Sequence, residues 1–170
     1  MKHVRFQSPD LSHAKAITSL VQGTTRLDKN SSYTYALWCT HFSSQSAVAV
    51  RDEEVIAFLT AFRSPERPES YFLWQTAAKP RHGVQALGID LVEFAVKREI
   101  SRGARYVEAS VDKENKPIRL VMKTLCKRLS GHLSEELLYS SELLSSSDTE
   151  HHDETLMRIS LPFDTAVQRT

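Results

Sequence analysis

Residues 79–88 place basic side chains and two glycines directly in front of a helical pattern. Arg81 and His82 precede Gly83, and apolar residues recur at helical spacing after Gly88. A glycine-bearing turn between a strand and a helix can offer several backbone N–H groups to a phosphate, and the helix dipole adds positive potential there. Ordinary tight turns use glycine for the same dihedral angles. The pattern therefore indicates either an anion-binding turn or a purely structural one, and this feature alone leaves both open.

Residues 151–154 read His-His-Asp-Glu, which are types that bind zinc. No Cys or His elsewhere in the sequence has the spacing that would complete a four-ligand site. Adjacent histidines are also common in solvated loops, so we expect no metal at this segment. Cys39 and Cys126 lie far apart without a pairing pattern, and we expect both to be free thiols of the interior.

The composition is that of an ordinary globular chain and excludes several function classes. Hydrophobic residues make up 41% and charged residues 25% of the 170 residues, which fits a single domain over 1–170. The net charge of +1 gives no strong field that would favour nucleic acid or an anionic membrane. The first residues lack the apolar core of a secretory signal, and no apolar run is long enough to span a bilayer. We therefore expect a cytoplasmic protein without nucleic-acid or membrane partners.

The elements that must position these residues are of mixed type. Short β-branched runs predict strands, and apolar residues at i, i+3 and i+7 predict helices. We expect Ser8 to cap the first helix, Gly23 to end it, and Asn115 to open the last one. Together these elements predict an α+β fold with helices packed on a mixed sheet. Strands are expected at 4–6, 47–50, 55–62, 71–78, 105–111 and 155–161, and helices at 8–23, 30–42, 89–103 and 115–125, with 130–148 a long loop that holds one helical turn near 135.

Four segments, in this order along the chain, carry a more specific pattern. They are residues 27–42, Phe-Leu-Trp-Gln at 72–75, Tyr-Val-Glu-Ala-Ser-Val at 106–111, and His-x-x-Glu-x-Leu-x-Arg-Ile at 151–159. Together they resemble the L-2,4-diaminobutyrate acetyltransferases, a family of the GCN5-related N-acetyltransferase (GNAT) superfamily. The turn at 79–88 resembles the pyrophosphate-binding loop of that superfamily, with Gly83, Ala86 and Gly88 at its signature positions. Ala86 stands where the pattern has glycine.

The resemblance implies a fold, a reaction and an assembly. The fold would be the GNAT fold, a mixed and mostly antiparallel central sheet flanked by helices. The reaction would transfer acetyl from acetyl-CoA, without a metal, to the 4-amino group of L-2,4-diaminobutyrate. The product, N4-acetyl-L-2,4-diaminobutyrate, would be the intermediate that is cyclised to ectoine, a solute made under osmotic stress. Members of this family are usually homodimers.

The same resemblance assigns site residues. Asp28, Tyr33 and Glu154 are the predicted catalytic residues, and they also belong to the predicted substrate pocket. Trp74, Glu108 and His151 complete that pocket. The residues predicted to hold acetyl-CoA are Gln75, Thr76, Ala77, Gly83, Val84, Gln85, Ala86, Leu87, Gly88 and Asn115.

Most of these residues also have a structural interpretation. Asp28 is a possible cap at the start of a helix, and Asn115 is another. Tyr33 is a possible interior phenol with a backbone partner, and Trp74 a possible core residue. Glu108 is a possible exposed residue at the end of a strand.

The chemistry sets further requirements. Acetylation needs a neutral amine, whereas a free alkylamine has a pKa near about 10, so the site must lower that pKa or accept a proton. The developing oxyanion needs a donor, which we expect among the backbone N–H groups of 74–77. Two alternatives remain: an acetyltransferase of ornithine, lysine or a polyamine, and a non-catalytic acyl-CoA sensor, suggested by Ala86.

Overall fold

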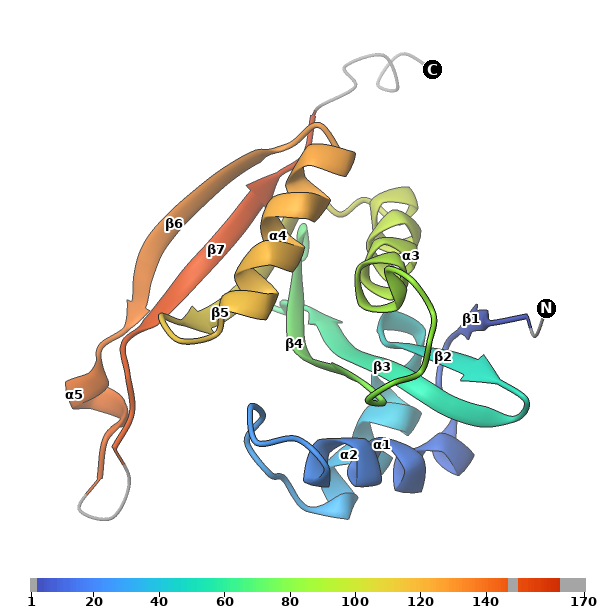
Figure 1. The fold of residues 1–170 in the computed structure, drawn as a ribbon. Helices are drawn as coiled ribbons and strands as arrows, with labels where there is room; N and C mark the ends of the chain where they lie inside the picture. Colours follow the sequence, from blue (N-terminus) through green and yellow to red (C-terminus); the bar gives the residue numbers. More distant parts are fainter. Residues whose placement is uncertain (1–2, 147–149, 163–170) are drawn as a thin grey trace, which may run out of the picture.

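The computed structural model describes residues 3–146 and 150–162 and contains one mixed β-sheet (Figure 1). The sheet has seven strands in the order β1-β2-β3-β4-β5-β7-β6. β4 and β5 are parallel, and every other neighbouring pair is antiparallel. The strands are β1 (Arg5–Gln7), β2 (Ala47–Arg51), β3 (Glu54–Arg63), β4 (Ser70–Ala78), β5 (Tyr106–Asp112), β6 (His132–Tyr139) and β7 (Glu154–Ser160).

Helices cover both faces of this sheet. On one face, α1 and α2 pack over Val48, Val50 and Phe58. On the other, α3 and α4 pack over Ala47, Ala49 and the alternate residues of the neighbouring strands (Figure 1). The helices are α1 (Ala14–Gln22), α2 (Ser32–His41), α3 (Leu87–Ser101), α4 (Lys116–Arg128) and the short α5 (Ser141–Leu144), with 3-10 turns at Leu11–His13 and Ser43–Gln45. The expected α+β fold with a mostly antiparallel mixed sheet is confirmed.

Strand alternation explains the two-sided core. Consecutive side chains of β2 point to opposite faces, so odd and even positions join different hydrophobic clusters. All four residues of 47–50 are buried, because both faces carry helices. No helix in the described part of the chain is long and apolar enough to cross a membrane.

Of the three residues that were expected to cap or end a helix, Gly23 and Asn115 are confirmed and Ser8 is wrong. Gly23 ends α1, and the Oδ1 atom of Asn115 accepts a hydrogen bond from the N–H of Ile118 at the start of α4. The first helical turn is capped by Asp10 rather than Ser8, because the Asp10 carboxylate accepts from the N–H of Ser12 at 2.9 Å. The helix therefore begins later than residue 8.

The expected loop over 130–148 is wrong for most of its length. Residues 132–139 form β6, an edge strand that pairs with β7 over its whole length. Most of its side chains are exposed, so the strand does not need alternating apolar and polar residues. The sequence therefore lacks the period-2 pattern that would have predicted a strand here. The turn near residue 135 is absent, and the helical turn lies at α5 instead. Residues 147–149 of this stretch lie outside the described residues.

β4 and β5 diverge halfway along their length. Their pairing covers Ser70–Leu73 and Tyr106–Ala109, whereas β4 continues to Ala78 and β5 to Asp112. On its other side β4 pairs with β3 up to Ala78, but the register shifts at one point: Ala61 is opposite Leu73 and Thr60 opposite Gln75. Trp74 is therefore the extra residue of a β-bulge, which bends a strand. The bend opens the sheet between β4 and β5.

Candidate functional site

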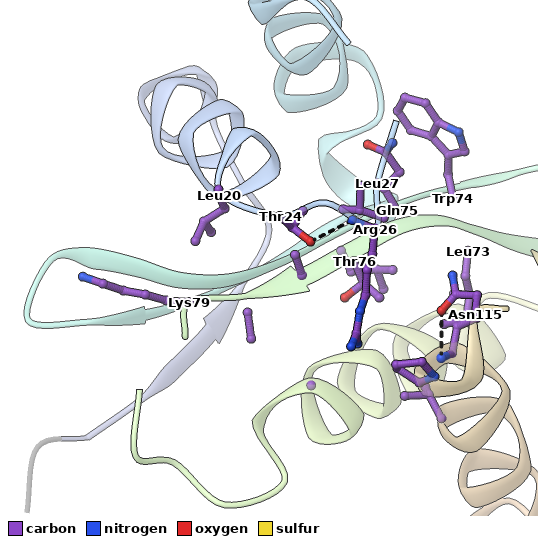
Figure 2. Close-up of a pocket in the computed structure, with 18 of the residues that line it drawn as sticks. Leu20, Thr24, Arg26, Leu27, Leu73, Trp74, Gln75, Thr76, Lys79 and Asn115 are labelled. Atoms are coloured by element: carbon purple, nitrogen blue, oxygen red, sulfur yellow. Dashed lines mark hydrogen bonds between the residues drawn. The ribbon is translucent and has the colours of Figure 1, made fainter. Parts of the chain in front are cut away.

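A cavity of about 730 Å³ occupies the region where the two strands separate. One wall is the stretch 73–78 of β4, and the opposite wall consists of Ala109 and Ser110 on β5 with the first turns of α4. Figure 2 shows Leu20, Thr24 and Leu27 on one side of β4 and Asn115 on the other, and Arg26 also lines the cavity. Gly88 of α3 completes the lining. Among the described residues, the edge of β4 at 74–78 that faces β5 has no strand partner, so its backbone groups can bind an extended ligand.

Trp74 lines this cavity and is held by an aromatic stack. Its ring lies 4.3 Å from the ring of Trp38, centroid to centroid, with 27° between the planes. Trp38 also stacks on Phe42 at 4.8 Å. Trp74 is only partly buried, so it forms a wall of the cavity rather than part of the closed core.

Asp28 lies next to the cavity in the segment that joins α1 to α2. Its neighbour Leu27 lines the cavity, and the Asp28 carboxylate has no hydrogen-bond or ion-pair partner within residues 3–146 and 150–162. The cap of α2 is Ser31, so the interpretation of Asp28 as that cap is wrong. A carboxylate without a protein partner can accept a cation or a proton.

The interior phenol of this segment is Tyr35, not Tyr33. Tyr33 is 70% exposed, so its interpretation as a buried phenol is wrong. Tyr35 is 0% exposed and donates a 2.8 Å hydrogen bond to Oε1 of Gln75. Burial raises the pKa of the Tyr35 hydroxyl, and the negative charge of Asp28 acts in the same direction. The hydroxyl is therefore a neutral donor at physiological pH.

Glu154 is connected to the cavity through Ser110. The Ser110 hydroxyl donates to Oε2 of Glu154 at 2.5 Å, and the two residues lie diagonally across the β5–β7 pair. His151 lies on the segment between α5 and β7, where its N–H donates to the Ser145 hydroxyl. α5 projects beyond the end of β5, away from α1 and α2 (Figure 1). Neither Glu154 nor His151 lines the cavity of the same chain, but Glu154 is one hydrogen bond away from it, through Ser110.

Glu108 occupies an internal ion network. Its carboxylate is fully buried and accepts from Arg158 Nε at 2.7 Å, Arg67 Nη2 at 3.2 Å and the Ser70 hydroxyl at 3.3 Å. The interpretation of Glu108 as an exposed residue is wrong. Direct contact with a substrate has no support in this geometry either, because the carboxylate is already paired and does not line the cavity.

The turn before α3 has the backbone geometry of a glycine-rich loop. Gly83 has φ 70° and Ala86 has φ 56°, so alanine adopts the left-handed conformation that glycine favours. Ala86 is the N-cap of α3, and no side chain of the described residues caps the N–H groups of Leu87 and Gly88 in the first turn. This end of the helix can receive an anionic group. The side chain of Leu87 itself is buried in the core.

The remaining predicted acetyl-CoA residues fall into two groups. Thr76 and Ala77 line the cavity, as do Gln75 and Asn115. Val84 and Gln85 belong to the turn and are not part of the lining. The backbone N–H of Gln75 donates to the Thr60 hydroxyl at 3.2 Å, so that group is already used. Within the described residues, the amide nitrogen of Asn115 has no partner, because only its oxygen caps α4.

Among the lining residues that were not predicted from the sequence, Arg26 and Ser110 have side chains suited to binding or catalysis. Arg26 is a lining cation whose guanidinium has no partner in the described part of the chain. Ser110 is the partner of Glu154. An isolated arginine in a loop carries no motif, but Ser110 lies inside the Tyr-Val-Glu-Ala-Ser-Val block and shares a strand face with Glu108. Across residues 3–146 and 150–162, no three His, Cys, Asp or Glu side chains come together as a possible metal site.

Comparison with known proteins identifies the class. The family model for the acetyltransferase (GNAT) family matches residues 15–125, which include both walls of the cavity. The chain belongs to the acetyltransferase (GNAT) family. The ribosomal-protein-S18-alanine N-acetyltransferase from Escherichia coli has the same fold, with a TM-score of 0.72 at 15% identity over 99% of this chain and 100% of that chain.

Within that family the similarity is narrower. The chain is 31% identical to an L-2,4-diaminobutyric acid acetyltransferase from Virgibacillus pantothenticus, over 89% of this chain and 94% of that protein. A protein of the same name from Shouchella clausii is 30% identical, over 89% and 83% of the two chains. The solved diaminobutyrate acetyltransferase from Paenibacillus lautus, in complex with L-2,4-diaminobutyric acid and coenzyme A, superposes with a TM-score of 0.89 at 26% identity, covering 96% of this chain and 98% of that one.

Proposed function

We propose that this acetyltransferase transfers acetyl from acetyl-CoA to the 4-amino group of L-2,4-diaminobutyrate. The observation that carries the proposal is the cavity between the diverging strands, in a chain that matches diaminobutyric acid acetyltransferases over about nine tenths of its length. The free edge of β4 and the N-terminus of α3 supply polar groups for the thioester arm and the pyrophosphate of acetyl-CoA. Thr76, Ala77 and Gly88, together with the turn at 83–87, would form that half of the site.

The amine half would lie between Asp28, Trp74 and Glu154. The unpartnered carboxylate of Asp28 can hold one ammonium group of the substrate, while the ring of Trp74 forms a wall beside it. Holding the substrate at one end decides which of its two amines reaches the thioester. Arg26, the lining cation without a partner, is suited to the substrate carboxylate or to a phosphate of CoA. Tyr33 and His151 remain proposed contacts at the exposed side of the site.

The reaction needs one proton acceptor and one oxyanion donor. The neutral amine attacks the acetyl carbonyl carbon, the C–N bond forms, and the C–S bond breaks as the CoA thiolate leaves. The proton of the attacking nitrogen passes to a carboxylate, for which Glu154 is the proposed acceptor, and Asn115 can donate its free amide to the departing sulfur. The oxyanion would accept from a backbone N–H of the bulged part of β4 other than that of Gln75, which Thr60 occupies.

Ala86, which suggested a non-catalytic acyl-CoA sensor, does not argue against turnover. The residue adopts the φ of a glycine, so the turn keeps its shape despite the extra methyl group. The proposed function is tested by incubating the protein with acetyl-CoA and diaminobutyrate and analysing the product by NMR. Acetylation at the 4-amino nitrogen supports the proposal, and acetylation at the 2-amino nitrogen, or of ornithine, lysine or a polyamine only, contradicts it.

We further propose a cytoplasmic homodimer acting in ectoine formation under osmotic stress. Two free thiols suit a reducing compartment. The edge strand β6 and the adjoining α5 expose Leu137 (64%), Tyr139 (45%) and Leu143 (71%), which favours a partner surface there. Light scattering after size exclusion should give twice the mass of one chain, and Leu137→Lys with Leu143→Lys should give the monomer. A monomeric parent would contradict the dimer.

A further inference from the structure

We propose that Tyr35 and Gln75 are positioning residues that fix the segment carrying Asp28 against the cavity. This inference rests on the proposed function, because it gives Asp28 its place beside the amine. Neither residue is proposed to touch the reacting atoms through its side chain.

The pair forms a continuous hydrogen-bonded path from α2 through β4 to the segment 27–30. Tyr35 OH donates to Gln75 Oε1 at 2.8 Å, and Gln75 Nε2 donates to the backbone oxygen of Asp28 at 3.1 Å. Asn30 Nδ2 lies 3.3 Å from that oxygen and 3.4 Å from the Tyr35 hydroxyl. One end of the Gln75 amide accepts and the other donates, so both partners fix a single orientation of the group.

These hydrogen bonds attach the segment 27–30 to β4. Among the described residues, the backbone groups of 27–30 make no hydrogen bond to another helix or strand except through the oxygen of Asp28. The attachment is protected from water, because Tyr35 is 0% and Gln75 6% exposed. A hydrogen bond in such surroundings is costly to break, since its partners would stay buried and unsatisfied.

The attachment point couples the segment to the cavity. Gln75 lines the cavity and directly follows Trp74, the bulged residue of β4. The path therefore sets the distance between the segment that carries Asp28, whose Leu27 lines the cavity, and Trp74 on the cavity wall. A displacement of about 1 Å in a positioning element can cost about 10²-fold in rate. Acetyl-CoA is proposed to bind Thr76, Ala77, Gly88 and the turn at 83–87, none of which takes part in the hydrogen bonds of this path.

The test compares two phenol deletions. Tyr35→Phe removes only the hydroxyl that holds Gln75. Tyr71→Phe is the matched control, because Tyr71 is also 0% exposed and its hydroxyl donates to the backbone oxygen of Gln45, but the residue does not line the cavity. We expect Tyr35→Phe to raise the KM for diaminobutyrate by about tenfold or more. The KM for acetyl-CoA should change by less than about twofold. The lost hydrogen bond, from Tyr35 to Gln75, makes no contact with acetyl-CoA in the proposed site.

A second readout is independent of activity. Arg26 and Lys29 are exposed and flank the attached residue, so trypsin can cut there when the segment moves. Tyr35→Phe should speed cleavage after these residues by roughly 2- to 10-fold, the factor for one lost hydrogen bond, and Tyr71→Phe should not. Equal effects of the two variants on cleavage, or equal changes in both KM values, would overturn the positioning role. If the parent protein acetylates another amine instead, diaminobutyrate is not the substrate. The positioning role would still be supported if Tyr35→Phe raised the KM for that amine and left the KM for acetyl-CoA unchanged.

Discussion

The hydroxyl of Ser110 donates a 2.5 Å hydrogen bond to Oε2 of Glu154, and this bond joins the cavity wall on β5 to a carboxylate on β7. The two strands pair in register, with Ser110 opposite Leu156 and Asp112 opposite Glu154. Two residues that are 44 positions apart in the sequence are thereby neighbours on one face of the sheet. The relationship gives Glu154 a fixed position next to the place where the amine is proposed to react.

Replacing Glu154 should remove activity and leave the fold intact. Glu154→Gln removes the proposed proton acceptor, so kcat/KM for diaminobutyrate should fall by about 10²-fold or more. The side chain is only partly buried, and the melting temperature should fall by no more than about 4 °C, the shift for about 1 kcal/mol in a chain of this size. Ser110→Ala should cost about tenfold, because the carboxylate loses its donor but stays in place. Near-parental turnover of Glu154→Gln would exclude the assigned role.

Asp28→Asn should weaken the binding of the amine without affecting stability. The carboxylate has no partner in the described part of the chain, so its removal breaks no contact of the fold. We expect the KM for diaminobutyrate to rise by about 10- to 100-fold, the loss expected for one charge-assisted hydrogen bond. Glu53→Gln is the control, since it removes an equal charge whose side chain is 89% exposed and pairs with Arg5. If both variants have the same kinetics, the effect of Asp28 is only one of net charge.

In the turn before α3, Ala86→Gly and Gly83→Ala should change stability in opposite directions. At Ala86 the left-handed φ of 56° costs an alanine about 1–2 kcal/mol, while glycine adds roughly 0.5–1 kcal/mol of chain entropy. Ala86→Gly should therefore bind acetyl-CoA equally well or better and gain up to about 1 kcal/mol of stability. Gly83→Ala should lose stability at φ 70°, although a Cβ there would meet no atom within 4 Å. Titration calorimetry and thermal melts test both. Weaker acetyl-CoA binding by Ala86→Gly would mean that the methyl group itself contacts the ligand.

The sequence predicted those parts of the fold whose residues repeat at a regular period. The buried strands, the stop at Gly23 and the cap at Asn115 follow from local chemistry that no distant contact overrides. β6 was missed because its outward and inward residues are both largely exposed, and its strand conformation depends on pairing with β7. Such a strand is specified by its partner, which single-sequence periodicity does not contain.

The candidate site, like the fold, was predicted only where local sequence carries the information. Of the residues that the motifs singled out, Trp74 lines the cavity, whereas Asp28 and Glu154 do not, because a motif does not distinguish side chains that face the cavity from those that face elsewhere. Glu108 belongs to the same block as Ser110, yet Arg158 stands directly opposite it across β5 and β7 and binds its carboxylate. The role of Tyr35 depends on the position of Gln75, 40 residues later, and no local pattern relates the two.

The buried thiol of Cys39 should be inert and should limit stability at high pH. Burial raises the pKa of Cys39 from its usual value near 9 to about 11. In the unfolded chain the thiol ionises at lower pH than in the folded chain, so stability is fully present below about pH 9 and falls as pH rises toward 11. Burial raises the pKa of Tyr35 in the same direction. Melting temperatures between pH 7 and 11 should show this fall, and Cys39→Ala should make it shallower. An equal slope in the variant would contradict the assignment.

The most direct test of the account measures CoA release by the purified protein with acetyl-CoA and a panel of amines. We predict turnover with L-2,4-diaminobutyrate, and a kcat/KM for ornithine that is about 10- to 200-fold lower, the range that one additional methylene allows. Diaminobutyrate that releases no CoA above background, while ornithine, lysine or a polyamine does, would contradict the account.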